Sequence, residues 1–479
     1  GHAERKSNVT VPGILEANWN MDRTTAIVSI SSVDSIQRIV ATFSATTSTM
    51  RLSNNVSSAR FSPTDNTIAF IEKEEAVCAH NYSPLPVVLT HGKGVYVWDD
   101  QDKRYLDMMS AYSAVSLGHS HPRIVDALQR QAQRLGVVSR AFYTDQLGRF
   151  VTHTCKLTSM DMGLPMNTGA EAVETALKAA RKWAYTVKGV TKDNAEIIVC
   201  DGNFHGRTIA IIAFSSEEQY RDGFGPFPKG FIRIPYGDAH ALEQAITPNT
   251  AAFLVEPIQG EGGIIVPPDG YLQDCAKICR DNNVLLFCDE IQTGLGRTGK
   301  LLACQHDNVQ PDGLMLGKAL GGGLLPVSMF LARDDVMQVF QAGDHGSTFG
   351  GYPLAAAVGL EALNVLVEDG LVFHAEEMGN YLMQELNKIE SPLITSVRGK
   401  GLLTGVEIDT DQISSRAFCE ALANNGVLSK ETHDTVIRFA PPLIITKPQI
   451  DWAIERIRQT FYEFENDLNS GYVQAAKML

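Results

Sequence analysis

Short apolar segments recur through the middle of the chain and constrain its fold more than any other feature. Each is bounded by Gly, Pro or Asp. They lie at residues 196–200, 231–234, 252–256, 284–288 and 314–316. Segments that are apolar throughout, rather than alternating with polar residues, are typical of strands buried on both faces of a mostly parallel sheet. They predict an α/β protein.

Helical patterns separate these segments. The clearest spans residues 170–187, where apolar side chains recur at the three- and four-residue spacing of a helix. Strands that alternate with helices predict a large domain with a mostly parallel central sheet flanked by helices. After about residue 360 the pattern changes to long helices, a strand-like segment at 402–408 and a helical ending at 450–464. This change indicates a smaller C-terminal α+β domain.

Composition narrows the possible partners. The chain has 479 residues, with 41 Lys and Arg against 55 Asp and Glu, which gives a formal charge of −14. The acidic balance argues against nucleic acid and anionic membrane surfaces as general partners. Every apolar run is shorter than the roughly 18 to 20 residues of a membrane span. Small molecules are therefore the expected ligands, with neither nucleic acid nor membrane as a partner.

The eight cysteines and the first 70 residues bear on the compartment. The cysteines form no C-x-x-C pair, and several lie in apolar segments, so we expect buried free thiols in a reducing compartment. Residues 1–70 are rich in Ser and Thr, and residues 37–63 contain arginines but no acidic residue. This N-terminal extension is interpreted either as flexible or as part of an organellar transit peptide. The mitochondrial matrix and the cytoplasm both remain open.

Three motifs carry chemistry. Thr168 and Glu171 have the spacing of a capping box at the start of the strongest helix, and such a helix end can bind phosphate. Asp289 follows a buried strand, where α/β sheets bind ligands, although an Asp there can also simply cap a loop. Lys318 follows another apolar strand; it is either a surface lysine or a buried amine with a lowered pKa. Pyridoxal phosphate requires all three: a Schiff-base lysine, an acidic partner and a helix end.

From about residue 79 to 464 the chain closely resembles the class III, or subgroup II, pyridoxal-phosphate aminotransferases of fold type I. The matching stretches are GKGVYVWD at 92–99, GHSHP at 118–122, NTGAEAVETALKAARK at 167–182, GNFHGRT at 202–208, EPIQGEGG at 256–263, DEIQTGLGRTG at 289–299, GKALGGG at 317–323 and the loop at Ser347 and Thr348. By this resemblance, residues 121–360 form the large cofactor-binding domain and 361–479 the small domain. Residues 71–120 are expected to pack on the small domain.

The resemblance also implies roles for individual residues. Lys318 forms the Schiff base and moves the proton of the reaction, while Asp289 pairs with the pyridine nitrogen. Phe204 stacks on the cofactor ring and Gln292 binds its phenolic oxygen. The other expected cofactor-binding residues are Gly169, Ala170, His205, Glu256, Ser347 and Thr348. Because Thr348 reaches the phosphate of the neighbouring subunit in this family, the resemblance implies a homodimer. No metal is expected.

Several stretches resemble one branch of the family, the ornithine δ-aminotransferases: residues 80–86, 110–115, 139–143 and 436–442. That branch transfers the δ-amino group of L-ornithine to 2-oxoglutarate, which gives glutamate 5-semialdehyde, or pyrroline-5-carboxylate after cyclisation, and glutamate. By resemblance, Tyr82 and Arg207 hold the α-amino and α-carboxylate groups of ornithine, and Tyr112 lines the pocket. Arg438 binds the α-carboxylate of glutamate, and Glu261 masks Arg438 while ornithine is bound.

Two positions depart from the pattern. His205 is usual in the broad family, but animal ornithine aminotransferases have Trp there, and Tyr352 replaces the more usual Asn. A sibling specificity for N-acetylornithine or 4-aminobutyrate is one alternative. A catalytically silent scaffold of the same fold is another, although the presence of Lys318 and Asp289 weighs against it.

Overall fold

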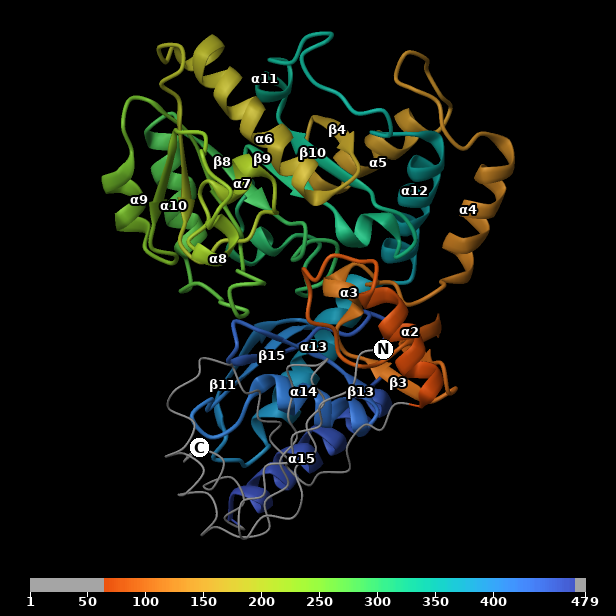
Figure 1. The fold of residues 1–479 in the computed structure, drawn as a ribbon. Helices are drawn as coiled ribbons and strands as arrows, with labels where there is room; N and C mark the ends of the chain where they lie inside the picture. The colour runs from red at the N-terminus through yellow and green to blue at the C-terminus, as the bar shows by residue number, and fades with distance from the viewer. Residues whose placement is uncertain (1–63, 470–479) are drawn as a thin grey trace, which may run out of the picture. The chain divides into compact units, whose positions relative to one another are not determined.

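The central sheet has seven strands in the order β4-β10-β9-β8-β7-β5-β6 (Figure 1). The computed structural model describes residues 64–469. The strands are β4 (Met162–Met166), β5 (Glu196–Cys200), β6 (Phe231–Ile234), β7 (Thr250–Val255), β8 (Leu285–Asp289), β9 (Gly313–Leu316) and β10 (Ser328–Ala332). Strand β10 runs antiparallel to both of its neighbours, β4 and β9, and all other adjacent strands in this sheet are parallel. The predicted mostly parallel sheet is confirmed, and β5 and β6 coincide with two of the apolar segments.

Both faces of this sheet are buried, as the apolar strands require. Along β8, Leu285 and Phe287 belong to one apolar cluster, whereas Leu286 and Cys288 belong to the other. Successive side chains point to opposite faces of a strand, so a strand between two layers of helices must be apolar throughout. Helix α6 contributes to the first cluster, and α10 and α12 contribute to the second.

The helices of this layered region include the one predicted most clearly. Helix α6 (Gly169–Trp183) begins with the predicted capping box and ends in a π-helical turn, η2 (Ala184–Lys188). The others are α4 (Pro122–Arg134), α5 (Leu147–Thr158), α7 (Ile209–Ile212), α8 (Glu218–Arg221), α9 (Ala239–Ala245), α10 (Tyr271–Asp281), α11 (Asp334–Met337) and α12 (Pro353–Glu368), with 3₁₀ turns η3 (Ala303–Asp307) and η4 (Lys318–Gly321).

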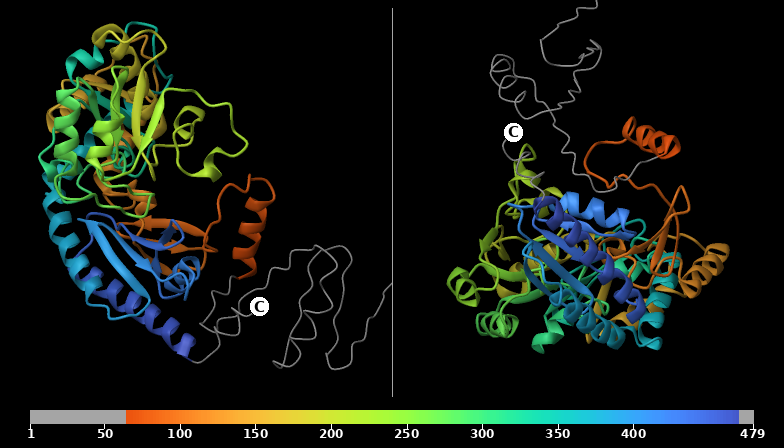
Figure 2. Two further views of the ribbon diagram at one scale, coloured as in Figure 1. Left: turned by 90° about the vertical axis from the view of Figure 1, so that its left-hand side faces the viewer. Right: turned by 90° about the horizontal axis from the view of Figure 1, so that it is seen from below.

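Two four-stranded sheets complete the fold. One has the order β11-β12-β15-β14 and is antiparallel throughout; the other has the order β1-β2-β3-β13. In the second sheet β13, from the C-terminal part of the chain, pairs in parallel with β3. Figure 2 shows the orange N-terminal strands beside the blue C-terminal part of the chain. The strands are β1 (Leu89–Lys93), β2 (Tyr96–Asp99), β3 (Arg104–Asp107), β11 (Ile394–Lys400), β12 (Leu403–Ile408), β13 (Val427–Leu428), β14 (Lys430–Thr432) and β15 (Val436–Phe439). Helices α13 (Leu371–Asn387), α14 (Ser415–Asn424) and α15 (Lys447–Asn469) lie with these sheets in the lower part of Figure 1.

The short element α3 (Ser110–Ser113) is a left-handed turn. All four residues have positive φ, from 47° at Ala111 to 74° at Ser113. This conformation costs about 1–2 kcal/mol for each residue with a side chain. Asp107 offsets part of that cost, because its carboxylate accepts hydrogen bonds from the backbone N–H groups of Met109 and Ser110 at 2.9 and 2.8 Å. Its other oxygen contacts His119 Nε2 at 2.7 Å.

Most of the predicted N-terminal extension lies outside the described residues. Its last part enters helix α2 (Asp65–Glu75), which Thr64 caps. Within residues 64–469, no helix is long and apolar enough to cross a membrane. All eight cysteines are free thiols, and only Cys78 is exposed. The expectation of buried free thiols is confirmed for the other seven.

Candidate active site

The predicted catalytic residues meet at one edge of the central sheet. Strand β8 ends at Asp289, and β9 leads through Gly317 to Lys318. The loops after β5 and β7 carry Phe204 and Glu256. Because these parallel strands end at the same edge, their following residues converge there, which is where α/β sheets bind ligands.

Lys318 is buried near several charged side chains but is not bonded to them. It makes no hydrogen bond or ion pair with a residue in the described range. Burial lowers the pKa of its ammonium, and nearby Glu261 opposes this shift in part. Its φ of 45° is rare for a residue with a side chain. A buried, unbonded amine whose pKa is lowered is suited to act as a nucleophile.

Asp289 is held by two contacts. Its Oδ1 accepts a hydrogen bond from the N–H of Ile291 at 3.0 Å, and its Oδ2 lies 2.6 Å from His205 Nδ1. Burial lowers the pKa of His205, but the contact with Asp289 outweighs burial, so the pKa is raised overall. The other ring nitrogen, Nε2, is buried and has no hydrogen-bond partner among residues 64–469. His205 therefore fixes the Asp289 carboxylate.

The start of α6 offers backbone N–H groups to an anion. Thr168 Oγ1 accepts from the N–H of Glu171, and the Glu171 carboxylate accepts from the N–H of Thr168 at 2.7 Å. The first N–H groups, at Gly169 and Ala170, stay available. A Cβ added at Gly169 would lie 3.1 Å from Ile291 Cδ1, so the backbone approaches its neighbour closely.

The loop at Ser347 and Thr348 reaches this helix end only in part. Ser347 Oγ accepts a hydrogen bond from Asn167 Nδ2 at 2.9 Å. Thr348 is exposed in the single chain and makes no hydrogen bond within the described residues. The structure thus brings Ser347, but not Thr348, to the other predicted residues.

Glu256 lies beneath the loop that carries Phe204 and His205. It is buried, and its Oε2 accepts from the N–H of Phe204 at 3.0 Å. Burial raises the pKa of Glu256 to about 7, with His205 opposing the shift. Gly206, with φ of 131°, allows the same loop to pack closely against the start of α6. A Cβ added at Gly206 would lie 3.0 Å from the Cβ of Ala170.

Glu261 and Arg438 form a two-pronged ion pair. The Arg438 Nη1 and Nη2 groups donate to Glu261 Oε1 and Oε2 at 2.6 and 2.9 Å, and the arginine side chain is 1% exposed. Gln292 Nε2 also donates to Glu261 Oε1, at 3.0 Å. Burial alone would raise the pKa of Glu261, but Arg438 outweighs burial and holds it at about 2. Thr432 Oγ1 donates a hydrogen bond to the backbone carbonyl of Glu261 at 2.7 Å.

The left-handed turn presents Tyr112 to this ion pair. The Arg438 guanidinium lies 5.1 Å from the centre of the Tyr112 ring. Burial raises the pKa of the Tyr112 hydroxyl, and Glu261 and Tyr82 contribute to the shift. Tyr82 is therefore within electrostatic reach of Tyr112, although its side chain is 77% exposed. The structure thus places Tyr112 against the ion pair, with Tyr82 near enough to affect it.

Arg207 is held differently from Arg438. Its guanidinium lies 3.5 Å from the centre of the Tyr220 ring and 5.4 Å from that of Phe204. It makes no ion pair with any residue between 64 and 469. Two arginines therefore flank the site, one neutralised by a carboxylate and one held by aromatic rings with its charge unpaired.

The family model described as "Aminotransferase class-III" matches residues 77–461. The chain is a class-III aminotransferase. A curated relative from Geobacillus sp. (strain WCH70), named ornithine aminotransferase, is 58% identical over 395 residues, which cover 82% of this chain and 98% of that protein. Among solved structures, the ornithine aminotransferase of Toxoplasma gondii is 47% identical, with a TM-score of 0.83 over 84% of this chain and 95% of that one. The acetylornithine aminotransferase of Elizabethkingia anophelis is 49% identical, with a TM-score of 0.76 over 84% and 100% of the two chains.

Class-III aminotransferases depend on pyridoxal phosphate, and the Toxoplasma structure is described with this cofactor at its active site. The site described above fits such a group. It combines an unbonded lysine, a fixed carboxylate and a capped helix end whose glycine packs closely against Ile291. The predicted fold, enzyme class and cofactor are thus confirmed.

Some residues of the site have no signal in the sequence. Tyr220 lies in the one-turn helix α8, and Thr432 lies on a short strand of the small sheet; neither belongs to a recognised motif. Both are placed by tertiary contacts alone.

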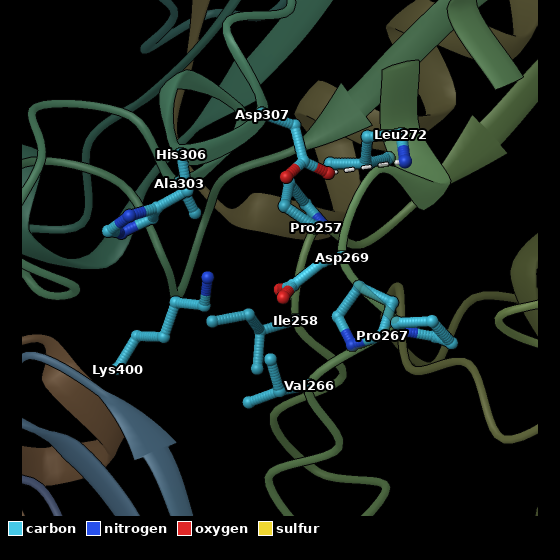
Figure 3. Close-up of a pocket in the computed structure, with 11 residues that line it drawn as sticks. Pro257, Ile258, Val266, Pro267, Asp269, Leu272, Ala303, His306, Asp307 and Lys400 are labelled. Atoms are coloured by element: carbon cyan, nitrogen blue, oxygen red, sulfur yellow. Dashed lines mark hydrogen bonds between the residues drawn. The ribbon is translucent and has the colours of Figure 1, made fainter. Parts of the chain in front are cut away.

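A separate pocket, lined among others by Ile258, Asp269 and Lys400, lies beyond the loop after β7 (Figure 3). Its lining includes none of the predicted site residues.

Proposed function

We propose that this class-III aminotransferase transfers the δ-amino group of L-ornithine to 2-oxoglutarate. The products are glutamate 5-semialdehyde, which cyclises to pyrroline-5-carboxylate, and glutamate. The observation that carries the proposal is the pairing of Arg438 with Glu261 while Arg207 keeps its charge unpaired. Of these two arginines, Arg207 alone is then available to a carboxylate in this state. That suits a first substrate with one carboxylate and a second with two.

The cofactor contacts are part of the proposal. The N–H groups of Gly169 and Ala170, together with Ser347, would hold the phosphate, and Asp289, fixed by His205, would face the pyridine nitrogen. Phe204 would stack on the ring, supported by Glu256, and Gln292 would bind the phenolic oxygen. When bound, pyridoxal phosphate supplies an electron-withdrawing ring and a carrier for the amino group. Lys318 holds and moves the proton at the amine-bearing carbon of the substrate.

Ornithine would bind with its α-carboxylate at Arg207 and its α-amino group at Tyr82. Tyr112 would line the pocket between these two residues and the Glu261–Arg438 pair. This anchoring keeps the α-amine away from Lys318 and brings the δ-amine to it. A guanidinium is suited to the carboxylate because it can donate two parallel hydrogen bonds.

The second substrate would enter the other way round. 2-Oxoglutarate has two carboxylates, and the one next to its oxo group would replace Glu261 at Arg438. Glu261 therefore acts as a gate, which must leave Arg438 before the second half of the cycle. The Thr432 hydroxyl holds the Glu261 backbone, so the movement is confined to the side chain.

Incubation with L-ornithine and 2-oxoglutarate, followed by an assay for pyrroline-5-carboxylate, tests the function. We expect product from the wild-type enzyme. The Lys318→Ala variant should give none and should lose the visible absorption of the bound cofactor. A coloured, cofactor-loaded wild-type protein without product would refute the proposal, and a wild-type protein that stays colourless after reconstitution would favour a silent scaffold.

N-acetylornithine is a second candidate substrate, because the Elizabethkingia neighbour carries that name at 49% identity; 4-aminobutyrate is the other sibling. A panel of the three amino donors separates them. Under our proposal Tyr82→Phe slows ornithine, whose free α-amine contacts the phenol. Unchanged ornithine turnover with faster N-acetylornithine or 4-aminobutyrate turnover would favour the siblings.

We also propose that the enzyme is a homodimer. Thr348 is exposed, and an apolar surface surrounds its loop and the segment before α5. The exposed side chains are Phe349 (47%), Phe142 (68%) and Tyr143 (105%). A partner that covers them would bring Thr348 to its phosphate. Sedimentation velocity is expected to give a dimer; a monomer with full activity would refute the shared site.

Two further assignments belong to this proposal. Residues 121–360 act as the cofactor-binding domain and 361–479 as the small domain, with 71–120 packed on the latter. The buried free thiols favour a reducing compartment, the cytoplasm or the mitochondrial matrix. Fusing residues 1–70 to a fluorescent protein distinguishes these: import into mitochondria supports a targeting role, and diffuse fluorescence supports the cytoplasm.

A further inference from the structure

The segment between α7 and β6, which contains the short helix α8, brings an unassigned tyrosine to the unpaired arginine. The ring of Tyr220 stands nearly perpendicular to that of Phe204, with an interplanar angle of 84° and centroids 6.2 Å apart. The Arg207 guanidinium occupies the corner between them, 3.5 Å from the Tyr220 centroid. Tyr220 is thus the closer of the two aromatic contacts.

An aromatic corner orders an arginine without neutralising it. The faces of both rings attract the guanidinium through their quadrupoles, which restricts its rotamers. A carboxylate partner would restrict it too but would also occupy its hydrogen-bond donors, as Glu261 does at Arg438. Arg207 therefore keeps its donors for an incoming anion. Because the arginine side chain is already ordered, it loses less conformational entropy when that anion binds.

Tyr220 is also within electrostatic reach of the Glu261 gate. Burial raises the pKa of its hydroxyl, and the charges of both Arg207 and Glu261 act on that group. The direct contact that carries the inference is the one with Arg207.

We propose that Tyr220 is a positioning residue for substrate carboxylates: it holds Arg207 in the orientation that binds the α-carboxylate of the amino donor. This inference rests on the proposed function, which assigns Arg207 to that carboxylate. Tyr220 acts through Arg207 and takes no part in the chemistry at Lys318.

The test compares substrates with and without a carboxylate. L-Ornithine is compared with 1,4-diaminobutane, which is ornithine without its carboxylate, in the holoenzymes of wild type, Tyr220→Phe, Tyr220→Leu and Tyr220→Gln. We expect Leu and Gln to raise KM for ornithine about tenfold with little change in kcat. The kcat/KM for diaminobutane should stay unchanged, and Tyr220→Phe, which keeps the ring, should behave as wild type.

A matched control lies on the same loop. Phe227 has its own cation–π contact, with Arg221 at 5.2 Å. Phe227→Leu removes that contact without touching Arg207 and should leave both substrates unaffected. Equal losses for ornithine and diaminobutane in the Tyr220 variants, or losses in Phe227→Leu as large as those in Tyr220→Leu, would overturn the proposal.

A binding measurement separates this inference from the proposed function. Glutarate is an unreactive dicarboxylate, and its dissociation constant can be measured by calorimetry on each holoenzyme. Tyr220→Leu should weaken glutarate about tenfold, and Tyr220→Phe should not. If wild type fails to convert ornithine, the proposed function falls while the glutarate comparison still decides the role of Tyr220. Equal glutarate affinity in Tyr220→Leu and wild type would refute that role.

Discussion

Replacing Glu261 with glutamine tests the gate between the two half-reactions. The change keeps the shape of the side chain and removes its charge, so Arg438 loses its counter-ion. The carboxyl has a pKa of about 2 instead of the ordinary 4.5. At about 1.4 kcal/mol per pKa unit, its surroundings stabilise the charged form by between about 3 and 4 kcal/mol. This is the most that 2-oxoglutarate has to overcome when it displaces Glu261, and it corresponds to about 300-fold in affinity.

We therefore expect Glu261→Gln to lower KM for 2-oxoglutarate by about tenfold to 100-fold. Ornithine should react less efficiently, because its carboxylate can now bind at Arg438 in an unproductive orientation. Stopped-flow absorbance of the cofactor measures each half-reaction separately. The ratio of kcat/KM for ornithine to that for glutamate should fall.

The effect should not depend on pH near neutrality. Because the pKa of Glu261 is lowered in the folded enzyme, the ion pair contributes fully above about pH 4.5 and is lost only as pH falls through about 2. The difference between variant and wild type should thus be equal at roughly pH 6 and 9. Glu407→Gln is the control, because it removes an ion pair of the small sheet, with Arg398 at 2.5 Å. An unchanged or higher KM for 2-oxoglutarate in Glu261→Gln would refute the gate.

Two stability predictions follow from the same structure. Ala111→Gly removes a Cβ from the left-handed turn and should raise the free energy of unfolding by about 1 kcal/mol, whereas Ala132→Gly, exposed in right-handed α4, should lower it by about as much. Denaturant titrations check both, and parallel losses would contradict the left-handed assignment. In the folded enzyme the pKa of Glu256 is raised to about 7 from the ordinary 4.5. As pH rises, this carboxyl therefore loses its proton in the unfolded chain before it does so in the folded enzyme. The free energy of unfolding of the wild type should fall by about 3 kcal/mol between about pH 4.5 and 7. Glu256→Gln should remove that slope, and identical pH profiles would show that the carboxyl ionises normally.

Local patterns predicted the centre of the molecule well. The strands around Asp289 and Lys318 are apolar throughout because both faces of the sheet are covered, and the capping box at Thr168 depends on neighbours three residues away. Each of these signals is contained within one segment of chain. The positions of the two candidate catalytic residues at strand ends could therefore be predicted before any contact was known.

Other features depend on contacts that no short segment encodes. The left-handed turn at Ser110–Ser113 contains no Gly or Asn, the residues that usually mark positive φ, and is imposed by Asp107 and its surroundings. Arg438 is paired with Glu261, 177 positions away in sequence, whereas Arg207 is held by aromatic side chains of its own stretch of chain, brought together by the fold. Motif resemblance named both arginines, but only the fold distinguishes the one that is paired from the one that is not.

The pairing of β3 with β13 has a consequence for how the chain is made. Lys103, beside β3, donates to the carbonyl of Ala423, a residue 320 positions later. At ribosomal rates of about 5 to 20 residues per second, β3 is exposed for some tens of seconds before its partner strand is synthesised. Throughout that time its backbone edge can pair with other chains. The enzyme's yield in cells should therefore depend on chaperones that shield the early hairpin until translation ends.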